Sequence, residues 1–315
     1  MSDEFNPYQS PETDAAPAVK PTLTFGEAVR RGFAAAHGAP AGAVWTFVLM
    51  APMQVIGGAM NAAMFSGDFF EQMQSGEFES TGGQPPPELI TMVGAGCFMC
   101  LWMPIMFFTM PWIWGGVMGQ VRDQIVGREP ASFGMHGKTF YGAMLLVMLL
   151  VVVGTIAANV PGTIVGQVVT SSEIQPGQPI TAEQMRALSR HPANIIANCF
   201  SGLLMALVGT LANFIIAALV ARGRGIGDGL SHGFTFCSKN MGAFIKVYFI
   251  YVALFLPFAI LQWIPQFLTT TMAIGIGVGF VSALYISYLT IVNLGMGGSV
   301  YAALTGDEKE AAPAT

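Results

Sequence analysis

Residues 140–168 read FYGAMLLVMLLVVVGTIAANVPGTIVGQV, an apolar stretch without a charged side chain. About 20 such residues, wound as a helix, cross the roughly 30 Å hydrocarbon core of a bilayer. Comparable stretches recur along the chain, and we expect spans at about 42–65, 89–119, 140–168, 194–221, 243–264 and 272–303. The chain is therefore predicted to be an all-α integral membrane protein with six transmembrane helices.

Composition and charge favour the same class. Hydrophobic residues make up 53% of the chain and charged residues only 10%, whereas roughly 25% of residues are charged in a soluble domain. Basic residues concentrate in the cytoplasmic loops of membrane proteins. With both termini in the cytoplasm, all Lys and Arg except Arg186 and Arg190 fall on the cytoplasmic side, and loop 66–88 carries only acidic charges. We expect a bacterial cytoplasmic (inner) membrane protein in this orientation, without affinity for nucleic acid.

The chain divides into a membrane domain and two tails. Residues 1–23 are rich in Pro, Ser and acidic side chains, a composition that buries too little apolar surface to fold. Residues 305–315 are similar. The domain prediction is a disordered cytoplasmic tail over 1–23, a six-helix membrane domain over 24–304 and a second disordered tail over 305–315.

A short amphipathic pattern precedes the first span and returns before the fifth. Thr24 and Glu27 have the spacing of a capping box, which marks a helix start. The segments 24–33 and 225–234 align through two glycines, an acidic residue and a phenylalanine, and a weaker copy begins at Ser132. We therefore expect two or three short cytoplasmic interfacial helices and a three-fold internal repeat of one such helix plus two spans. The alternative to the first interfacial helix is a helix packed on the bundle. The alternative to the repeat is chance similarity among Gly-rich apolar sequences.

Three segments carry a resemblance to known proteins. They are 225–264, the closing Leu294–Leu304 (LGMGGSVYAAL) and Val160–Gly162 (VPG). Together they resemble bacterial multi-pass families of unknown function that are related to the membrane domain attached to some glycerophosphodiester phosphodiesterases. The opening NPYQSP at residues 6–11 resembles the start of many such bacterial membrane proteins. The resemblance covers roughly 24–304 and implies a helical membrane fold without an established activity.

Methionines form the most specific pattern inside a span. Because a helix turns about 100° per residue, one face of the second span carries Met92, Met99, Met103, Met106 and Met110. Thioether ligands suit Cu(I), so the last four are candidate metal ligands in a soft-metal transporter. Methionine is also a common gap-filler in packed helices, and packing is the favoured interpretation. Cys97 and Cys100 lie in the same apolar span, where packing is again favoured over redox chemistry or a disulfide.

The remaining polar groups of the spans are amides rather than charges: Gln54, Asn61, Asn159, Asn198, Asn213 and Asn293. Proton-coupled transporters place ionisable residues inside the membrane, so their absence from the span interiors argues against proton coupling. Hydrogen bonds between helices are the favoured use of the amides, and a path for a neutral solute is the alternative. The four histidines are expected on the solvated surface.

Glycine pairs four residues apart let helices approach closely. They occur at Gly115/Gly119, Gly162/Gly166 and Gly275/Gly279, either within the chain or between copies. The expected partners are membrane lipids. A protein partner or a second copy of the chain is expected to bind through these Gly-x-x-x-Gly faces. We name no catalytic residue, cofactor site or metal centre. The favoured function is a non-enzymatic scaffold or accessory in envelope organisation, and the alternative is a transporter or channel for a neutral solute or a soft metal such as Cu(I).

Overall fold

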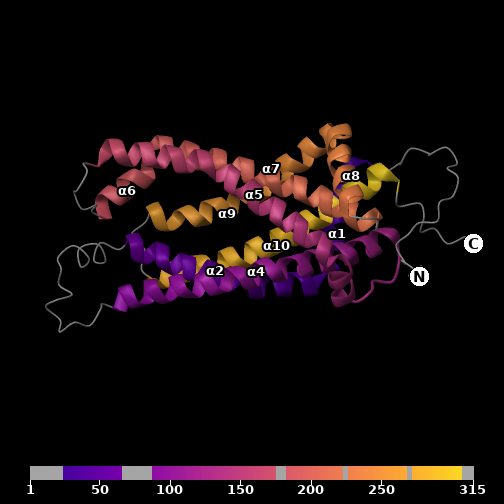
Figure 1. Cartoon of the computed structure of the whole chain (residues 1–315), viewed down its shortest axis with the longest axis horizontal. Helices are drawn as coiled ribbons and strands as arrows, with labels where there is room; N and C mark the ends of the chain where they lie inside the picture. Colours follow the sequence, from indigo (N-terminus) through magenta and orange to yellow (C-terminus); the bar gives the residue numbers. More distant parts are fainter. Residues whose placement is uncertain (1–23, 66–86, 175–181, 223–225, 268–271, 307–315) are drawn as a thin grey trace, which may run out of the picture.

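The computed structural model describes residues 24–65, 87–174, 182–222, 226–267 and 272–306, and within these ranges the secondary structure is helical throughout (Figure 1). The helices are α1 (Phe25–His37), α2 (Pro40–Phe65), α4 (Pro87–Val126), α5 (Phe133–Glu173), α6 (Ala182–Arg190), α7 (Pro192–Arg222), α8 (Ile226–Lys239), α9 (Met241–Phe267) and α10 (Met272–Thr305). Six of the described helices, α2, α4, α5, α7, α9 and α10, are long and apolar enough to cross a membrane. The predicted six-span, all-α fold is confirmed.

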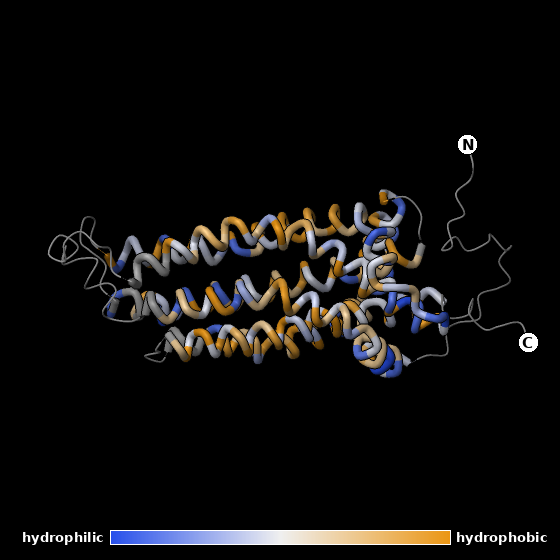
Figure 2. Tube along the Cα trace, turned by 90° about the horizontal axis from the view of Figure 1, so that it is seen from below, coloured by the Kyte–Doolittle hydropathy of each residue, from blue (hydrophilic) through white to orange (hydrophobic). Residues whose placement is uncertain are grey.

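The spans form an elongated bundle with two different ends. Figure 1 places α1 and α8 at one end of the bundle and α6 at the other. Figure 2 shows hydrophilic residues gathered mainly toward the ends and apolar residues along the spans. We call the first end the basic end, because its exposed residues include Arg30, Arg31, Arg128, Lys138, Lys239 and Lys246. The predicted tail 1–23 and nearly all of 305–315 lie outside the described residues.

Helix α1 begins at the predicted capping box. The Thr24 backbone N–H donates to the Glu27 carboxylate at 2.9 Å, and the Glu27 N–H donates back to the Thr24 hydroxyl. These bonds satisfy N–H groups that a helix start otherwise leaves unpaired. The buried face of α1, formed by Ala28, Gly32, Ala35 and Ala36, lies against α10. The alternative of a helix packed on the bundle is therefore what the structure shows, with Arg30 and Arg31 on the exposed side.

The turn between α4 and α5 differs from the prediction. Helix α4 continues past the expected end at residue 119 to Val126, where Gly127 takes a φ of 72° and ends it. Ser132 then caps α5, its hydroxyl accepting from the Met135 N–H. No helix-breaking residue separates this start from the span, so the third interfacial helix is not a separate element. It is the first two turns of α5.

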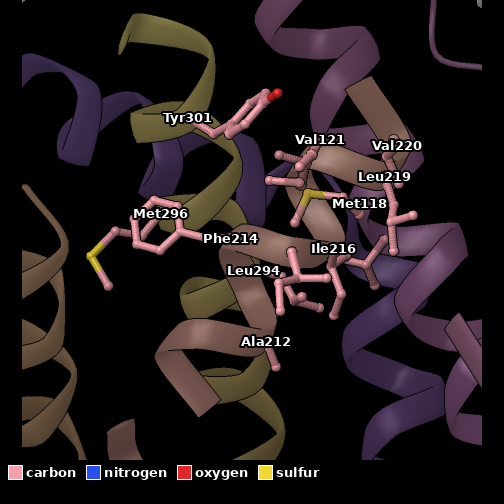
Figure 3. Packing of buried hydrophobic residues seen from close by; sticks show 14 of the residues in the cluster. Met118, Val121, Ala212, Phe214, Ile216, Leu219, Val220, Leu294, Met296 and Tyr301 are labelled. Atoms are coloured by element: carbon pink, nitrogen blue, oxygen red, sulfur yellow. The ribbon is translucent and has the colours of Figure 1, made fainter. Parts of the chain in front are cut away.

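The best-buried part of the bundle lies toward the basic end. There α4, α7 and α10 contact one another, and their buried stretches include 115–119, 212–220 and 291–303. Figure 3 shows side chains of these three helices converging, among them Met118, Phe214 and Tyr301. The opposite halves of the spans are less enclosed, and Leu101 and Val153, for example, are exposed by 72% and 64%. The basic end thus holds the packed core of the fold.

Candidate functional site

A small cavity lies where α4, α7 and α10 meet at the basic end. Its volume is about 20 Å³, room for about one water molecule. Its walls are mostly apolar, and its polar lining comes from Arg122 of α4 and Tyr301 of α10. The candidate functional site comprises this cavity and the polar residues around it.

Arg122 joins two of these helices. Its Nη1 donates to the Val220 carbonyl oxygen at 2.7 Å. Val220 belongs to the last turn of α7, whose final carbonyl groups have no partner inside their own helix. A guanidinium there satisfies one of them and complements the negative end of the helix dipole. Arg122 therefore holds the end of α7 against α4.

The next residue, Asp123, makes a buried hydrogen-bonded pair with His136 at the start of α5. Its Oδ2 lies 2.8 Å from His136 Nε2, and the same oxygen accepts from the Ala131 N–H at 3.0 Å. The His136 side chain is fully buried and that of Asp123 is 6% exposed. Gly119 makes room for the imidazole, because a Cβ there would lie 2.3 Å from His136 Cγ. The pair fixes the α4–α5 turn from inside the fold.

This burial limits what the pair can do chemically. A carboxylate and an imidazole in contact can exchange a proton, but a substrate would have to reach them through closely packed protein. No group of three or more His, Cys, Asp or Glu capable of holding a metal ion occurs among the described residues. The expectation that His136 lies on the solvated surface was wrong. Its partner is 13 residues away across a turn, and a glycine on α4 forms the space for its ring.

Two junctions at the basic end follow one geometry. A Cβ at Gly32 of α1 would lie 2.7 Å from the Gly295 oxygen of α10, and one at Gly233 of α8 would lie 2.9 Å from the Ile215 Cα of α7. Gly32 and Gly233 are the aligned glycines of the predicted repeat. Each allows a short helix to touch the backbone of a core span, so the two sequence copies make equivalent contacts.

At the third junction the larger residue is on the short helical segment and the glycine on the span, the reverse of the contact between Gly233 and Ile215. In the copy that begins at Ser132, Phe140 aligns with Gly32 and Gly233. Here the glycine is on the span, and a Cβ at Gly115 of α4 would lie 3.2 Å from Phe140 Cβ. Exchanging large for small on both sides keeps the helices close. These contacts support the predicted three-fold repeat. In it the start of α5 packs on α4, α8 packs on α7 and α1 packs on α10.

The methionine face of α4 does not converge on one point. Met99 approaches α2, where its Cε lies 3.9 Å from a Cβ built on Gly57. Met103 is 58% exposed, Met106 packs on the core, and Met110 is 4% exposed within it. The side chain of Met92 lies outside the described residues. Because the exposed and the buried members face different surroundings, the geometry shows no shared ligand set.

The cysteines are all free thiols, with Cys97, Cys100 and Cys199 exposed and Cys237 buried. The expected absence of a disulfide agrees with this. The expectation that Cys97 and Cys100 pack inside the bundle does not, because both lie on the exposed side of α4.

Two of the predicted amides show different bonding patterns. Gln262 of α9 donates to Gln54 of α2 at 3.0 Å, an interhelical bond of the expected kind. Asn159 of α5 donates both to the Thr155 oxygen of its own helix at 2.8 Å and to the Met205 sulfur of α7 at 3.6 Å. Asn213 and Asn293 are buried toward the basic end, where Asn213 Nδ2 and Asn293 Oδ1 have no hydrogen-bond partner in the described part of the chain.

The glycine pairs join helices of the same chain. Gly115 and Gly119 receive α5, Gly162 lies against Ser201 of α7, and Gly275 and Gly279 meet the backbone of α2. A Cβ at Gly275, for instance, would lie 2.4 Å from the Gly58 oxygen. Of the two interpretations left open by the sequence, the intramolecular one is observed for these pairs.

Arg122, Asp123 and Tyr301 were not predicted to lie close to one another. A usable signal was present, since Arg122 and Asp123 follow an apolar run directly and Gly119 precedes them by one turn. The capped helix that follows carries His136 in its first turn. Together these features predict that Asp123 and His136 pair across the turn. Comparison with known proteins found no matching family model, no matching curated protein and no matching solved structure.

Proposed function

We propose that this polytopic membrane protein is a non-enzymatic scaffold or accessory of a bacterial cytoplasmic membrane, with its basic end in the cytoplasm. The observation that carries the proposal is the closely packed core at that end. The buried stretches of α4, α7 and α10 meet there around a cavity of only about 20 Å³. A body this closely packed is suited to holding a surface in a fixed shape.

Charge supports the orientation. The exposed Arg30, Arg31, Lys239 and Lys246 belong to α1, α8 and the start of α9, which share one end of the bundle. Lys and Arg are retained preferentially on the cytoplasmic side. The basic end would then present two short helices, α1 and α8, to cytoplasmic partners.

Packing argues for a scaffold over a channel. In lipid, helices associate mainly through close packing, and fully buried side chains such as Ile113, Phe214 and Met296 supply it here. A path through the basic end would have to separate the three core helices and break the bond from Arg122 to Val220. Scaffolding needs no such separation.

A transporter for a neutral solute is the second candidate, and one observation favours it. The Gln54–Gln262 bond and the unpartnered amide atoms of Asn213 and Asn293 place neutral polar groups inside the bundle. Such groups can bind an uncharged polar molecule. This candidate requires a second conformation in which the basic end opens.

Two measurements on tagged protein from native membranes test the proposal. Affinity purification in mild detergent with mass spectrometry should recover a stoichiometric protein partner. The partner should be lost with Arg30→Ala combined with Lys239→Ala, and kept with Arg190→Ala at the opposite end. Proteoliposomes placed in glycerol or urea should swell no faster than protein-free liposomes. Fast swelling without a partner would overturn the scaffold proposal in favour of transport.

A further inference from the structure

An exposed strip at the basic end combines apolar, aromatic and cationic side chains from three helices. We call it the α2–α4–α5 strip and define it by Val44, Trp45, Val48, Phe108, Trp112 and Lys138. Val44, Val48 and Phe108 are 60%, 46% and 55% exposed, which in a membrane span means contact with lipid. Trp45 is 45% exposed.

Ring contacts tie the strip together. Trp45 meets Trp112 edge to face with centroids 5.7 Å apart, and Trp112 meets Phe133 at 4.8 Å. Trp112 also lies against the first turns of α5, where a Cβ at Gly137 would come 2.5 Å from its indole nitrogen. Lys138 follows Gly137 directly, so its side chain starts beside this aromatic group.

The polar groups of the strip lie at the same depth. Trp45 and Lys138 each come five residues after the start of their helices, α2 and α5, both of which begin at the basic end. At 1.5 Å per residue this is about 7–8 Å along each helix. Tryptophan and lysine at such a depth are typical of the boundary between acyl chains and headgroups.

Neither group has a partner among the residues that the structure describes. The indole N–H of Trp45 makes no hydrogen bond, and the Lys138 ammonium no ion pair, to any residue that the structure describes. By contrast, the Trp102 indole donates to the Leu49 oxygen at 2.9 Å. The neighbouring carboxylate of Asp123 already pairs with His136. The Trp45 indole is 45% exposed, so its N–H can donate to an acceptor at the membrane boundary.

We propose that the α2–α4–α5 strip binds an anionic phospholipid of the leaflet at the basic end. Its phosphate accepts from Trp45 and pairs with Lys138, and one acyl chain lies along Val48 and Phe108. The Lys138 ammonium and the Trp45 N–H suit a phosphate, and the apolar surface of Val48 and Phe108 suits an acyl chain. This inference needs only that the chain spans a membrane and is independent of the scaffold proposal.

Native mass spectrometry of the purified protein tests the site. The protein in mild detergent is mixed with dioleoyl phosphatidylglycerol or dioleoyl phosphatidylcholine, and retained lipid is counted. We expect preferential retention of phosphatidylglycerol, reduced about five-fold by Lys138→Gln and also reduced by Trp45→Phe, which keeps the ring contacts but removes the N–H. Lys239→Gln, an exposed basic residue on α8, is the matched control and should leave retention unchanged.

Each alternative outcome has a distinct meaning. Equal losses from Lys138→Gln and Lys239→Gln would show diffuse attraction to anionic lipid and overturn the site. Equal retention of both lipids by the unaltered protein would overturn it as well. Displacement by excess glycerol 3-phosphate would show that the strip recognises a free phosphate ester rather than a lipid. Quenching of tryptophan fluorescence by brominated phosphatidylglycerol, stronger than by brominated phosphatidylcholine, provides a check on the unmutated chain.

Discussion

Replacing Gly119 by alanine should destabilise the protein through the ring of His136. The new Cβ would lie 2.3 Å from His136 Cγ, about 1 Å closer than ordinary van der Waals contact at roughly 3.4 Å. The imidazole must therefore move by about that distance. The 2.8 Å contact between His136 and Asp123 would then stretch beyond hydrogen-bonding range.

The expected loss of stability combines two costs, crowding and a lost hydrogen bond, with one gain from helix propensity. A crowded core costs about 1–3 kcal/mol, and a hydrogen bond to a charged group contributes about 1.5–3 kcal/mol. Alanine returns up to about 1 kcal/mol through its higher helix propensity. We expect a net loss of about 1.5–5 kcal/mol for Gly119→Ala. Gly142→Ala on α5, where a Cβ meets no atom within 4 Å, is the matched control and should be neutral or slightly stabilising.

Equilibrium unfolding in mixed micelles of mild detergent and dodecyl sulfate measures both variants. Equal stability of the two would refute the proposed clash. A double-mutant cycle identifies the cause. If the lost stability arises at the imidazole, Gly119→Ala should cost little in a chain that already carries His136→Ala, and an undiminished cost there would assign the effect to another neighbour.

Three further predictions concern separate parts of the molecule. Burial raises the pKa of the Cys237 thiol to about 11, so maleimide should label it far more slowly at pH 7.5 than a cysteine placed at the exposed neighbour Ser238; equal rates would refute the burial. Hydrogen bonds from Thr24 at the helix cap lower the pKa of Glu27. The capping bond should therefore stabilise α1 fully above the ordinary pKa of a glutamate and weaken as the pH falls through the lowered pKa. Hydrogen exchange should show this as faster exchange of the α1 amides alone. Because Met103 and Met106 share no ligand set, changing both to leucine should leave the stoichiometry of bound Cu(I) unchanged in a titration, and a loss of one ion per chain would restore the metal hypothesis.

The spans and the α1 cap were predictable because each is local in sequence. An uncharged apolar run of sufficient length has one stable placement in a bilayer, and the spacing of Thr24 and Glu27 encodes its own hydrogen bonds. The expected span borders agree with the helices to within a few residues, except that α4 continues to Val126 and α5 extends from Phe133 to Glu173, beyond both ends of the expected 140–168. The length of the apolar runs and the capping pattern were therefore enough to predict most of the fold.

The candidate site was not predictable in the same way, because its contacts depend on which face of each helix meets a neighbour. Met103 and Met110 share a face by periodicity, yet one is exposed and the other buried, since neighbouring helices cover α4 only over part of its length. The burial of His136 could not be predicted from its local sequence, because its partner Asp123 lies on another helix. Helical periodicity gives a direction around the axis but not the identity of the neighbour.

The contact between Gly32 and Gly295 has a consequence for biosynthesis. The two residues are 263 positions apart in the chain, which at about 5–20 residues per second corresponds to roughly 15–50 s of translation. Throughout that interval the apolar face of α1 has no α10 to cover it and must be shielded by the bilayer surface or by a chaperone. A chain that stops before its last span would keep this face uncovered, so the contact can act as a completion signal that separates finished molecules from fragments destined for proteolysis.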